Sequence, residues 1–241
     1  MPRFFIEKPH SDIISFDEET ARHISLALRM RIGDELVLCD GMGTDYDAVI
    51  ESVSRGSVTA RVLSSQPGIS EPALKVTLFQ CLPKADKLEQ IVRQGVEVGA
   101  SEIVPIVSRY TVPHKNAEAR QKQIGRLRAI SKSAAAQSGR GIIPLVAEHT
   151  SFEDMVDTLT QYDAALFFYE RGGQNLGEVL AGLPDSIKTM AVIIGAEGGF
   201  HPEEAEQLEN AAYVCSLGPR ILRCETAPIV ALGNIFCFYG A

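Results

Sequence analysis

The first 70 residues combine one helical pattern with several short apolar runs. Ile24, Ala27 and Leu28 recur at helical spacing before Gly33 and predict a short helix. Three β-rich runs follow, separated by Asp-Gly and Arg-Gly turn signals, at 35–39, 46–53 and 57–63. We expect a short helix that leans on a small β-barrel.

The pattern changes after the Ser-, Pro- and Gly-rich stretch 64–72, which cannot continue a helix or a central strand. We place a domain boundary there, with one domain over residues 1–70 and a second over residues 71–241. In the second domain, strands are expected at 73–82, 102–107, 163–169, 189–195 and 213–218, and helices at 86–99, 118–139, 151–159, 202–211 and 226–238. This alternation predicts an α/β fold with a largely parallel sheet covered by helices.

The loops after 163–168, 190–195 and 213–217 form the candidate site, because ligands of parallel α/β sheets bind beyond the carboxyl ends of the strands. Two of these three loops are unusual. "GAEGG" follows the strand 189–195, and "LGPRILRCETA" follows the strand that begins at residue 213. A glycine cluster alone is more often a tight turn with a helix cap. Together, however, the two loops bring small residues, two arginines, an acid and a threonine to strand ends, which favours a binding site.

Missing motifs exclude several classes of ligand and reaction. The loop "GAEGG" is not followed by the Lys-Ser/Thr pair of a Walker loop, and the chain contains no G-x-G-x-x-G, which disfavours a phosphate loop and a Rossmann-type nucleotide site. A hydrolase could use Cys224 and Glu225, but no histidine forms a recognisable partner signature. The five cysteines are scattered without a C-x-x-C pair, so we expect neither disulfides nor a metal site.

Composition and charge narrow the remaining classes. Hydrophobic residues make up 45% of the chain and charged residues 22%, and we expect a soluble, cytoplasmic protein with no membrane partner. The net charge of −8 argues against coating nucleic acid through bulk electrostatics. Basic residues are nevertheless concentrated between residues 115 and 140 and around the first helix. Such runs are usually solvated helix faces, but two concentrated patches also suit an RNA-binding protein.

Six blocks of the chain resemble, in order and spacing, the RsmE family of 16S ribosomal RNA uridine N3-methyltransferases. They are "PRFF", "RHISLALRMRIGDELVLCDG", "KADKLEQIVRQGVEVGASEIVPIVSRY", "AQSGR", "IIGAEGGFHPEEAE" and "LGPRILRCETA". The resemblance implies an N-terminal PUA-like, RNA-binding β-barrel and a C-terminal SPOUT domain whose parallel sheet ends in a trefoil knot. It also implies a homodimer that uses S-adenosyl-L-methionine to methylate N3 of uridine 1498 in the assembled small ribosomal subunit, with no DNA partner.

The resemblance also assigns roles to particular residues. Cofactor contacts are expected from Phe168, Gly195, Glu197, Gly198, Gly199, Leu217, Gly218, Ile221, Leu222, Arg223, Thr226 and Ala227. RNA contacts are expected from Arg22, Arg29, Arg31 and Arg140. We further hypothesise that Arg223 or Arg220 stabilises negative charge on the uracil, and that Glu225 either accepts the proton or caps the last helix.

Three positions depart from the usual pattern of the family. Ala196 and Cys224 stand where Pro and Thr are common, and Ala136 stands where Glu is frequent. These changes remove no glycine and no arginine from the two loops. The alternative function is a non-catalytic RNA-binding factor of ribosome assembly, and the intact loops argue against it.

Overall fold

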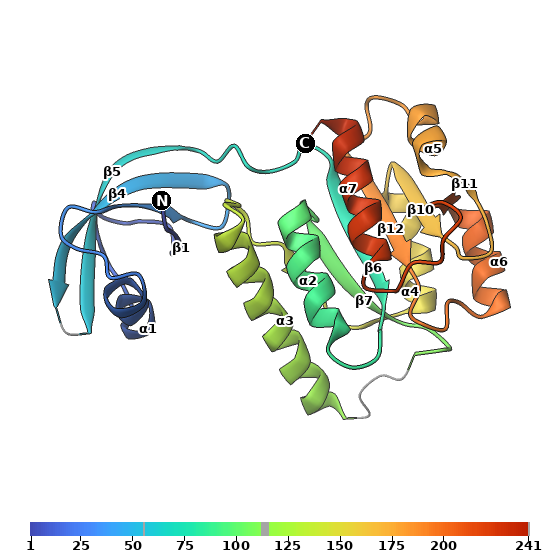
Figure 1. Ribbon diagram of the computed structural model, residues 1–241, viewed down its shortest axis with the longest axis horizontal. Coiled ribbons are helices and arrows are strands. Elements are labelled where there is room, and N and C mark those ends of the chain that lie inside the picture. Colours follow the sequence, from blue (N-terminus) through green and yellow to red (C-terminus); the bar gives the residue numbers. More distant parts are fainter. Residues whose placement is uncertain (55, 112–115, 241) are drawn as a thin grey trace. The chain divides into compact units, whose positions relative to one another are not determined.

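The computed structural model describes residues 1–54, 56–111 and 116–240, which form two compact units (Figure 1). The first comprises Met1–Glu71 with Ala135–Ile143, and the second comprises Pro72–Ala134 with Pro144–Ala241. The chain thus divides between residues 71 and 72, close to the expected boundary. The sequence gives no sign, however, that residues 135–143 belong with the N-terminal residues.

The first unit contains a five-stranded sheet whose strands follow the order β1-β3-β4-β5-β2. β1 pairs in parallel with β3, and the other neighbours are antiparallel. The three β-rich runs predicted from the sequence correspond to β3, β4 and β5. The strands are β1 (Arg3–Phe5), β2 (Ile13–Ser15), β3 (Glu35–Cys39), β4 (Thr44–Ser54) and β5 (Ser57–Pro67).

A short helical segment packs against this sheet. The α-helix α1 (Glu18–Arg22) continues into the π-helical turn η1 (His23–Ala27), and Ala21 and Ile24 are fully buried. Leu28, which the sequence places on the same face, is 41% exposed. The π turn explains this error, because its wider hydrogen bonds rotate every later residue away from the regular helical face.

The second unit is built on an eight-stranded parallel sheet. Its strands follow the order β11-β13-β10-β12-β6-β7-β8, and β9 also pairs with β7. The predicted α/β fold is therefore confirmed, whereas the trefoil knot stays a prediction. The strands are β6 (Lys75–Cys81), β7 (Glu102–Val107), β8 (Leu145–Val146), β9 (Thr150–Ser151), β10 (Ala164–Phe168), β11 (Gln174–Asn175), β12 (Thr189–Ile194) and β13 (Tyr213–Ser216).

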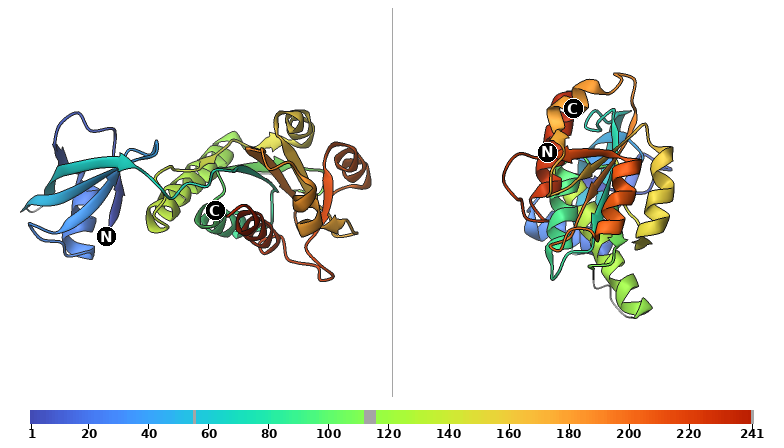
Figure 2. Two further views of the ribbon diagram at one scale, coloured as in Figure 1. Left: turned by 90° about the horizontal axis from the view of Figure 1, so that it is seen from above. Right: turned by 90° about the vertical axis from the view of Figure 1, so that its right-hand side faces the viewer.

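Helices cover both faces of this sheet. Figure 2 shows α2 and α7 side by side on one face and α4 with α6 on the other. The helices are α2 (Lys87–Val98), α3 (Ala117–Gln137), α4 (Phe152–Thr158), α5 (Leu176–Gly182), α6 (Pro202–Ala211) and α7 (Ala227–Tyr239). The predicted helices are all present; α5 was missed. Every helix in the described ranges is too short or too polar to cross a membrane.

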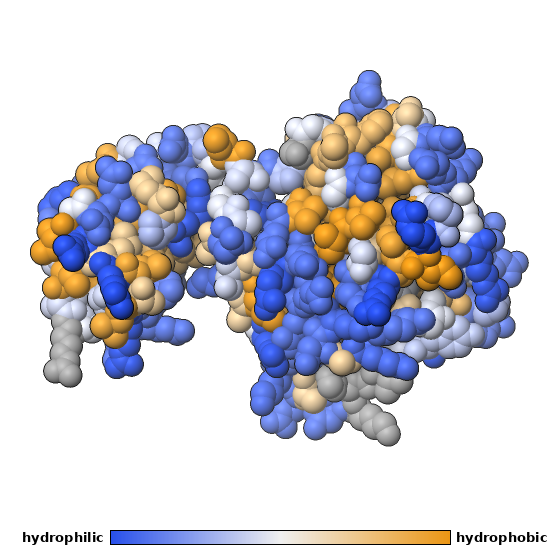
Figure 3. Space-filling model, in the orientation of Figure 1, coloured by the Kyte–Doolittle hydropathy of each residue, from blue (hydrophilic) through white to orange (hydrophobic). Residues whose placement is uncertain are grey.

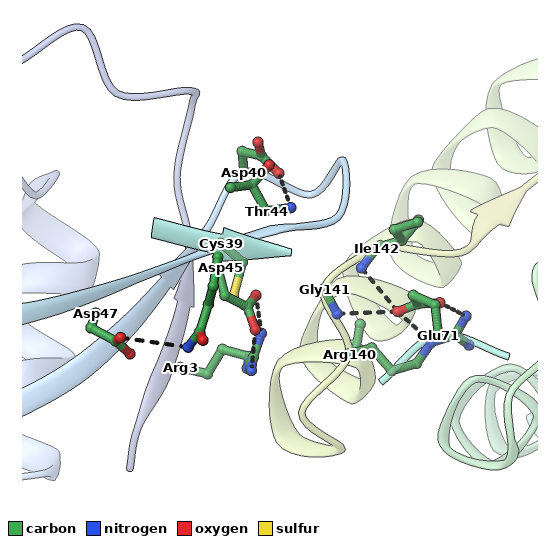
Figure 4. Close-up of polar contacts among 12 residues, drawn as sticks. Arg3, Cys39, Asp40, Thr44, Asp45, Asp47, Glu71, Arg140, Gly141 and Ile142 are labelled. Atoms are coloured by element: carbon green, nitrogen blue, oxygen red, sulfur yellow. Dashed lines mark hydrogen bonds and ion pairs between the residues drawn. The ribbon is translucent and has the colours of Figure 1, made fainter. Parts of the chain in front are cut away.

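A buried polar cluster holds residues 135–143 within the first unit (Figure 4). One carboxylate oxygen of Glu71 accepts a hydrogen bond of 2.6 Å from the Arg140 guanidinium, and the other accepts bonds of 3.1 Å from the amides of Gly141 and Ile142. Only 4% of Arg140 is exposed. The cluster therefore gives Arg140 a structural role, and its predicted contact with RNA is disfavoured by its burial.

Replacing Glu71 with Gln would change an acceptor oxygen into a donor that faces other donors. We expect Glu71→Gln to lower the free energy of unfolding by about 2–3 kcal/mol, measured as a lower urea midpoint by far-ultraviolet circular dichroism. The control is Glu148→Gln, which breaks a 3.1 Å ion pair to Arg128 at the surface and should cost less than about 1 kcal/mol. Equal midpoints for the two variants would contradict a stabilising role for the buried cluster.

Candidate active site

Three neighbouring strands of the parallel sheet end at the same level. Phe168, the last residue of β10, lies opposite Ile194 of β12 on one side and opposite Cys215 of β13 on the other. Parallel strands end at the same sheet edge, so the three loops that follow lie together. They line a pocket of about 930 Å³, at the place predicted from the sequence.

The structure places nearly all the proposed cofactor residues around this pocket. Thr226 and the proposed proton acceptor Glu225 are outside its lining, although Glu225 lies beside it through its contact with Lys87. Arg220 and Arg223 both line the pocket. The proposed cofactor residues in its wall are Phe168, Gly195, Glu197, Gly198, Gly199, Leu217, Gly218, Ile221, Leu222, Arg223 and Ala227.

The loop after β12 is both a tight turn and a wall of the pocket. The Gly199 amide donates a hydrogen bond of 3.0 Å to the Ala196 carbonyl, and Gly199 has a left-handed φ of 64°. A Cβ at Gly199 would lie 2.7 Å from a Glu170 carboxylate oxygen, and one at Gly195 would lie 3.2 Å from the Gly199 Cα. The left-handed φ therefore favours glycine at position 199, and the close backbone contact favours it at position 195; the Glu170 carboxylate ends an exposed, flexible side chain.

A buried glutamine fixes the start of this glycine loop. Gln80, on the adjacent strand β6, is fully buried, and its amide nitrogen donates hydrogen bonds to the carbonyls of Gly195 (3.1 Å) and Cys81 (3.0 Å). Its amide oxygen has no hydrogen-bond partner among the described residues. Sequence reasoning missed Gln80, because a single polar residue in an apolar strand does not reveal which backbone carbonyl it meets.

The loop after β13 presents its side chains to solvent. Ile221 is 82% exposed, and the Arg223 side chain is 84% exposed. The Arg223 carbonyl accepts hydrogen bonds from the amides of Thr226 (2.8 Å) and Ala227 (2.9 Å), which fixes the backbone just before α7. Hydrogen bonds thus fix the C-terminal end of this loop, while the side chains of Ile221, Arg220 and Arg223 can contact a ligand in the pocket.

The thiol of Cys224 is not activated. Burial raises its pKa to about 12, and the neighbouring carboxylates of Glu225 and Glu197 act in the same direction. A thiol with this pKa stays protonated at neutral pH and is a poor nucleophile. The structure therefore gives no support to a hydrolase that uses Cys224.

Lys87, at the start of α2, contacts two acidic residues at the site, Glu197 and Glu225. Its Nζ lies 2.8 Å from Glu197 and 3.3 Å from Glu225, and these contacts raise the pKa of Lys87. Burial acts to raise the pKa of Glu197, but hydrogen bonds from Lys87 and from backbone amides outweigh it and lower that pKa. The pKa of Glu225 is also lowered, by its own backbone amide, by Cys224 and by Lys87. Both carboxylates are charged at neutral pH, so Glu225 is a weak proton acceptor.

The proposed RNA-binding residues in and just after the first helical segment lie at the surface. Arg22 forms an exposed ion pair of 2.6 Å with Glu18, and Arg29 adopts a left-handed φ of 55°. Arg31 is exposed, and its backbone amide donates a hydrogen bond to Asp34. These three side chains are available to a partner, unlike Arg140. In the described part of the chain, no group of three or more His, Cys, Asp or Glu side chains is placed to bind a metal ion.

Comparison with known proteins identifies the class to which this fold and site belong. Residues 70–236 match the model of an RNA methyltransferase domain, and residues 16–63 match that of an RNA methyltransferase PUA domain. The chain is 32% identical to the ribosomal RNA small subunit methyltransferase E of Bacillus subtilis, over 98% of this chain and 96% of that protein. It is 33% identical to the protein of that name from Mycobacterium bovis, over 91% and 84% of the two chains.

A solved structure gives the same result. The chain resembles the ribosomal RNA small subunit methyltransferase E of Neisseria gonorrhoeae, solved with bound S-adenosyl methionine, with a TM-score of 0.89 and 26% identity over 99% of this chain and 98% of that one. The protein is thus an RNA methyltransferase by class. Within that class, it belongs to the ribosomal RNA small subunit methyltransferase E family.

The packing at Gly199 leads to a direct test of the pocket. Gly199→Ala would add a Cβ in a left-handed conformation against Glu170, so we expect the affinity for S-adenosylmethionine to fall at least about tenfold in calorimetric titration. The matched control is Gly182→Ala, because a Cβ at the exposed end of α5 meets nothing within 4 Å. Unchanged affinity in Gly199→Ala would show that the glycine loop does not shape the binding site.

Proposed function

We propose that this chain transfers the methyl group of S-adenosyl-L-methionine to N3 of uridine 1498 in 16S ribosomal RNA. The observation that carries the proposal is the pocket at the ends of β10, β12 and β13, lined by glycines, apolar side chains and arginines. Its place in the sheet and its lining suit an adenosine-containing cofactor. A protein retaining only RNA binding would have no need of so complete a pocket.

The residues around the pocket fit the proposed cofactor. Gly195 and Gly199 have no side chain and line the pocket, so the backbone there can approach a ligand closely. Phe168, Ile221 and Leu222 supply apolar walls for an adenine ring, and backbone groups of the same loops can bind its edge. When bound, S-adenosylmethionine supplies an electrophilic methyl group on a positively charged sulfur.

The arginines of the second loop would act on the uracil. Loss of the N3 proton leaves negative charge on the uracil oxygens O2 and O4, and exposed guanidiniums at the pocket can stabilise it. Arg223 and Arg220 both line the pocket, which supports this role. We do not assign the proton to Glu225, since its pKa is lowered and its carboxylate already bonds Lys87.

The substrate is proposed to be the assembled small ribosomal subunit in the cytoplasm. The net charge of −8 gives little general attraction for RNA, so recognition would depend on the shape of a folded particle. Arg22, Arg29 and Arg31 lie at the surface of the first unit and would contact RNA phosphates. Naked RNA is therefore expected to be a poor substrate.

A homodimer is proposed from the surface of α7. Pro228, Leu232 and Phe236 face the core, yet Phe238 is 49% exposed and Cys237 is also exposed. Figure 3 shows apolar residues gathered over α7 and the loop before it, with strongly polar residues beside them. A helix that is apolar on most sides is normally buried on most sides. A second copy of the chain would cover this surface.

The substrate assignment can be tested on ribosomal particles. We expect the protein and S-adenosylmethionine to methylate small subunits that lack this modification, and to produce a single new reverse-transcription stop at uridine 1498, because an N3-methyl group blocks base pairing. Free 16S RNA should react far more slowly. A stop at another uridine would contradict the substrate assignment, and failure of millimolar S-adenosylmethionine to bind would contradict the proposed reaction.

The role of Arg223 makes a separate prediction. Arg223→Ala should lower kcat by about 10²–10³-fold, because it removes a donor that stabilises charge in the transition state. Cofactor affinity should change by only a few fold, since the exposed guanidinium is not needed to form the pocket. The control is Arg93→Ala on the exposed side of α2, which should keep normal activity. Full activity in Arg223→Ala would exclude the role proposed for this side chain.

A further inference from the structure

Lys87 connects three segments that surround the proposed cofactor site. It stands at the start of α2, just after the β6–α2 connection, whereas Glu197 belongs to the loop after β12 and Glu225 to the loop after β13. Its Nζ binds both carboxylates and also lies 3.8 Å from the sulfur of Cys224. We infer that Lys87 is a positioning residue that holds the two pocket loops in the geometry that binds the cofactor. This inference rests on the function proposed above.

The contacts of Glu197 show how the glycine loop is held. Besides the ammonium group of Lys87, its carboxylate accepts hydrogen bonds of 3.3 and 3.2 Å from the backbone amide of Lys84. Lys84 lies in the short connection between β6 and α2, and Lys87 is the first residue of α2. The Glu197 side chain thus fixes the middle of the glycine loop to a neighbouring element, which the backbone turn between Ala196 and Gly199 cannot do alone.

The charges explain why a cation is needed between these loops. The two carboxylate oxygens bind one Nζ, so they lie within about 6 Å of each other, where like charges repel. The side chains of Lys87 and Glu197 are 32% and 30% exposed, and that of Glu225 is 13% exposed, so solvent screens the repulsion only partly. Without Lys87, the loops after β12 and β13 would be driven apart, and two walls of the pocket would move with them.

The other titratable groups at this point do not replace Lys87. Cys224 is neutral, because burial raises its pKa to about 12. The Arg223 guanidinium lies 4.0 Å from Glu225, but its side chain is 84% exposed and gives little compensation. One ammonium with two carboxylates leaves a net charge of −1, which also suits a positively charged methyl donor. Removal of Lys87 would make the cluster more negative, which by itself would strengthen binding of a positively charged ligand. It would also disturb the pocket walls, which would weaken binding of any ligand. Because these two effects on affinity have opposite signs for the methyl donor, they can be separated.

The test compares two ligands that differ in the charge on sulfur. Calorimetric titration of the full chain would use S-adenosylmethionine and its product S-adenosylhomocysteine, which lacks the positive charge on sulfur. We expect Lys87→Met to weaken both ligands by about tenfold or more, since both need the same walls. Lys87→Arg should restore affinity to within about threefold of the wild type. The control is Lys132→Met on the exposed side of α3, which should bind both ligands normally.

A second variant and a pH series distinguish charge balance from a general loss of structure. Glu225→Gln added to Lys87→Met should recover part of the affinity, because it removes one of the two repelling charges. The affinity of Lys87→Met should rise as the pH falls from 8 to 5, as closely spaced carboxylates take up protons, while the wild type changes little. If Lys87→Met does not fold, the double variant is compared with Glu225→Gln alone, and only a small difference in affinity is expected.

The possible outcomes separate this inference from the proposed function. If the wild type binds S-adenosylmethionine and Lys87→Met binds both ligands equally well at every pH, the positioning role is excluded and the proposed function stands. If Lys87→Met binds S-adenosylmethionine more tightly and S-adenosylhomocysteine unchanged, the positioning role is also excluded, because such a result shows an effect of the altered charge and none on the pocket walls. If the wild type binds neither ligand, the proposed function and this inference both fail.

Discussion

The backbone pairing of β10 with β12 on one side and with β13 on the other is the constraint on which the site depends. Its register sets Phe168, Ile194 and Cys215 level, so the loops that follow begin at one edge of the sheet. The loop after β12, which contains the glycines, and the loop after β13, which contains Arg220 and Arg223, therefore lie side by side at the pocket. Two polar side chains then fix these loops. Gln80, near the end of β6, bonds the Gly195 carbonyl, and Lys87, at the start of α2, contacts Glu197 and Glu225. Strand pairing brings the loops together, and side chains from β6 and α2 set their positions.

The sequence predicts the elements of the second unit well because each depends on nearby residues. Alternation of apolar runs with amphipathic helices locates the strands and helices, and the position of "GAEGG" just after a strand indicates the site. The order of the strands in the sheet could not be predicted, because an apolar run in the sequence does not specify which other strands it pairs with. Lys87 was missed for the same reason: in the first turn of a helix it looks like a solvated charge, and only folding places it against Glu197, 110 residues away. The apolar pattern likewise does not distinguish the π turn before Leu28 from a regular α-helix.

Arg140 shows that burial decides whether a basic residue is available to bind RNA. In the sequence it ends a long basic segment and is as plausible an RNA contact as Arg22 or Arg31. In the structure it lies under the surface with Glu71, whereas the other two arginines are exposed. The first unit therefore offers fewer free cations than its sequence suggests. A binding surface with few cations available for phosphate contacts has to gain its selectivity from shape complementarity, which agrees with the structured ribosomal substrate proposed above.

The distribution of cysteines has a practical consequence. Cys39, Cys81, Cys215 and Cys224 are buried, and burial raises each of their pKa values to about 12, whereas Cys237 is exposed on α7. Electrophilic thiol reagents would therefore react at Cys237 and leave the four buried cysteines unmodified. The native chain thus carries a built-in attachment point for a fluorophore or spin label, on the helix surface proposed to meet a second copy. Its assembly could be followed without first removing the other cysteines.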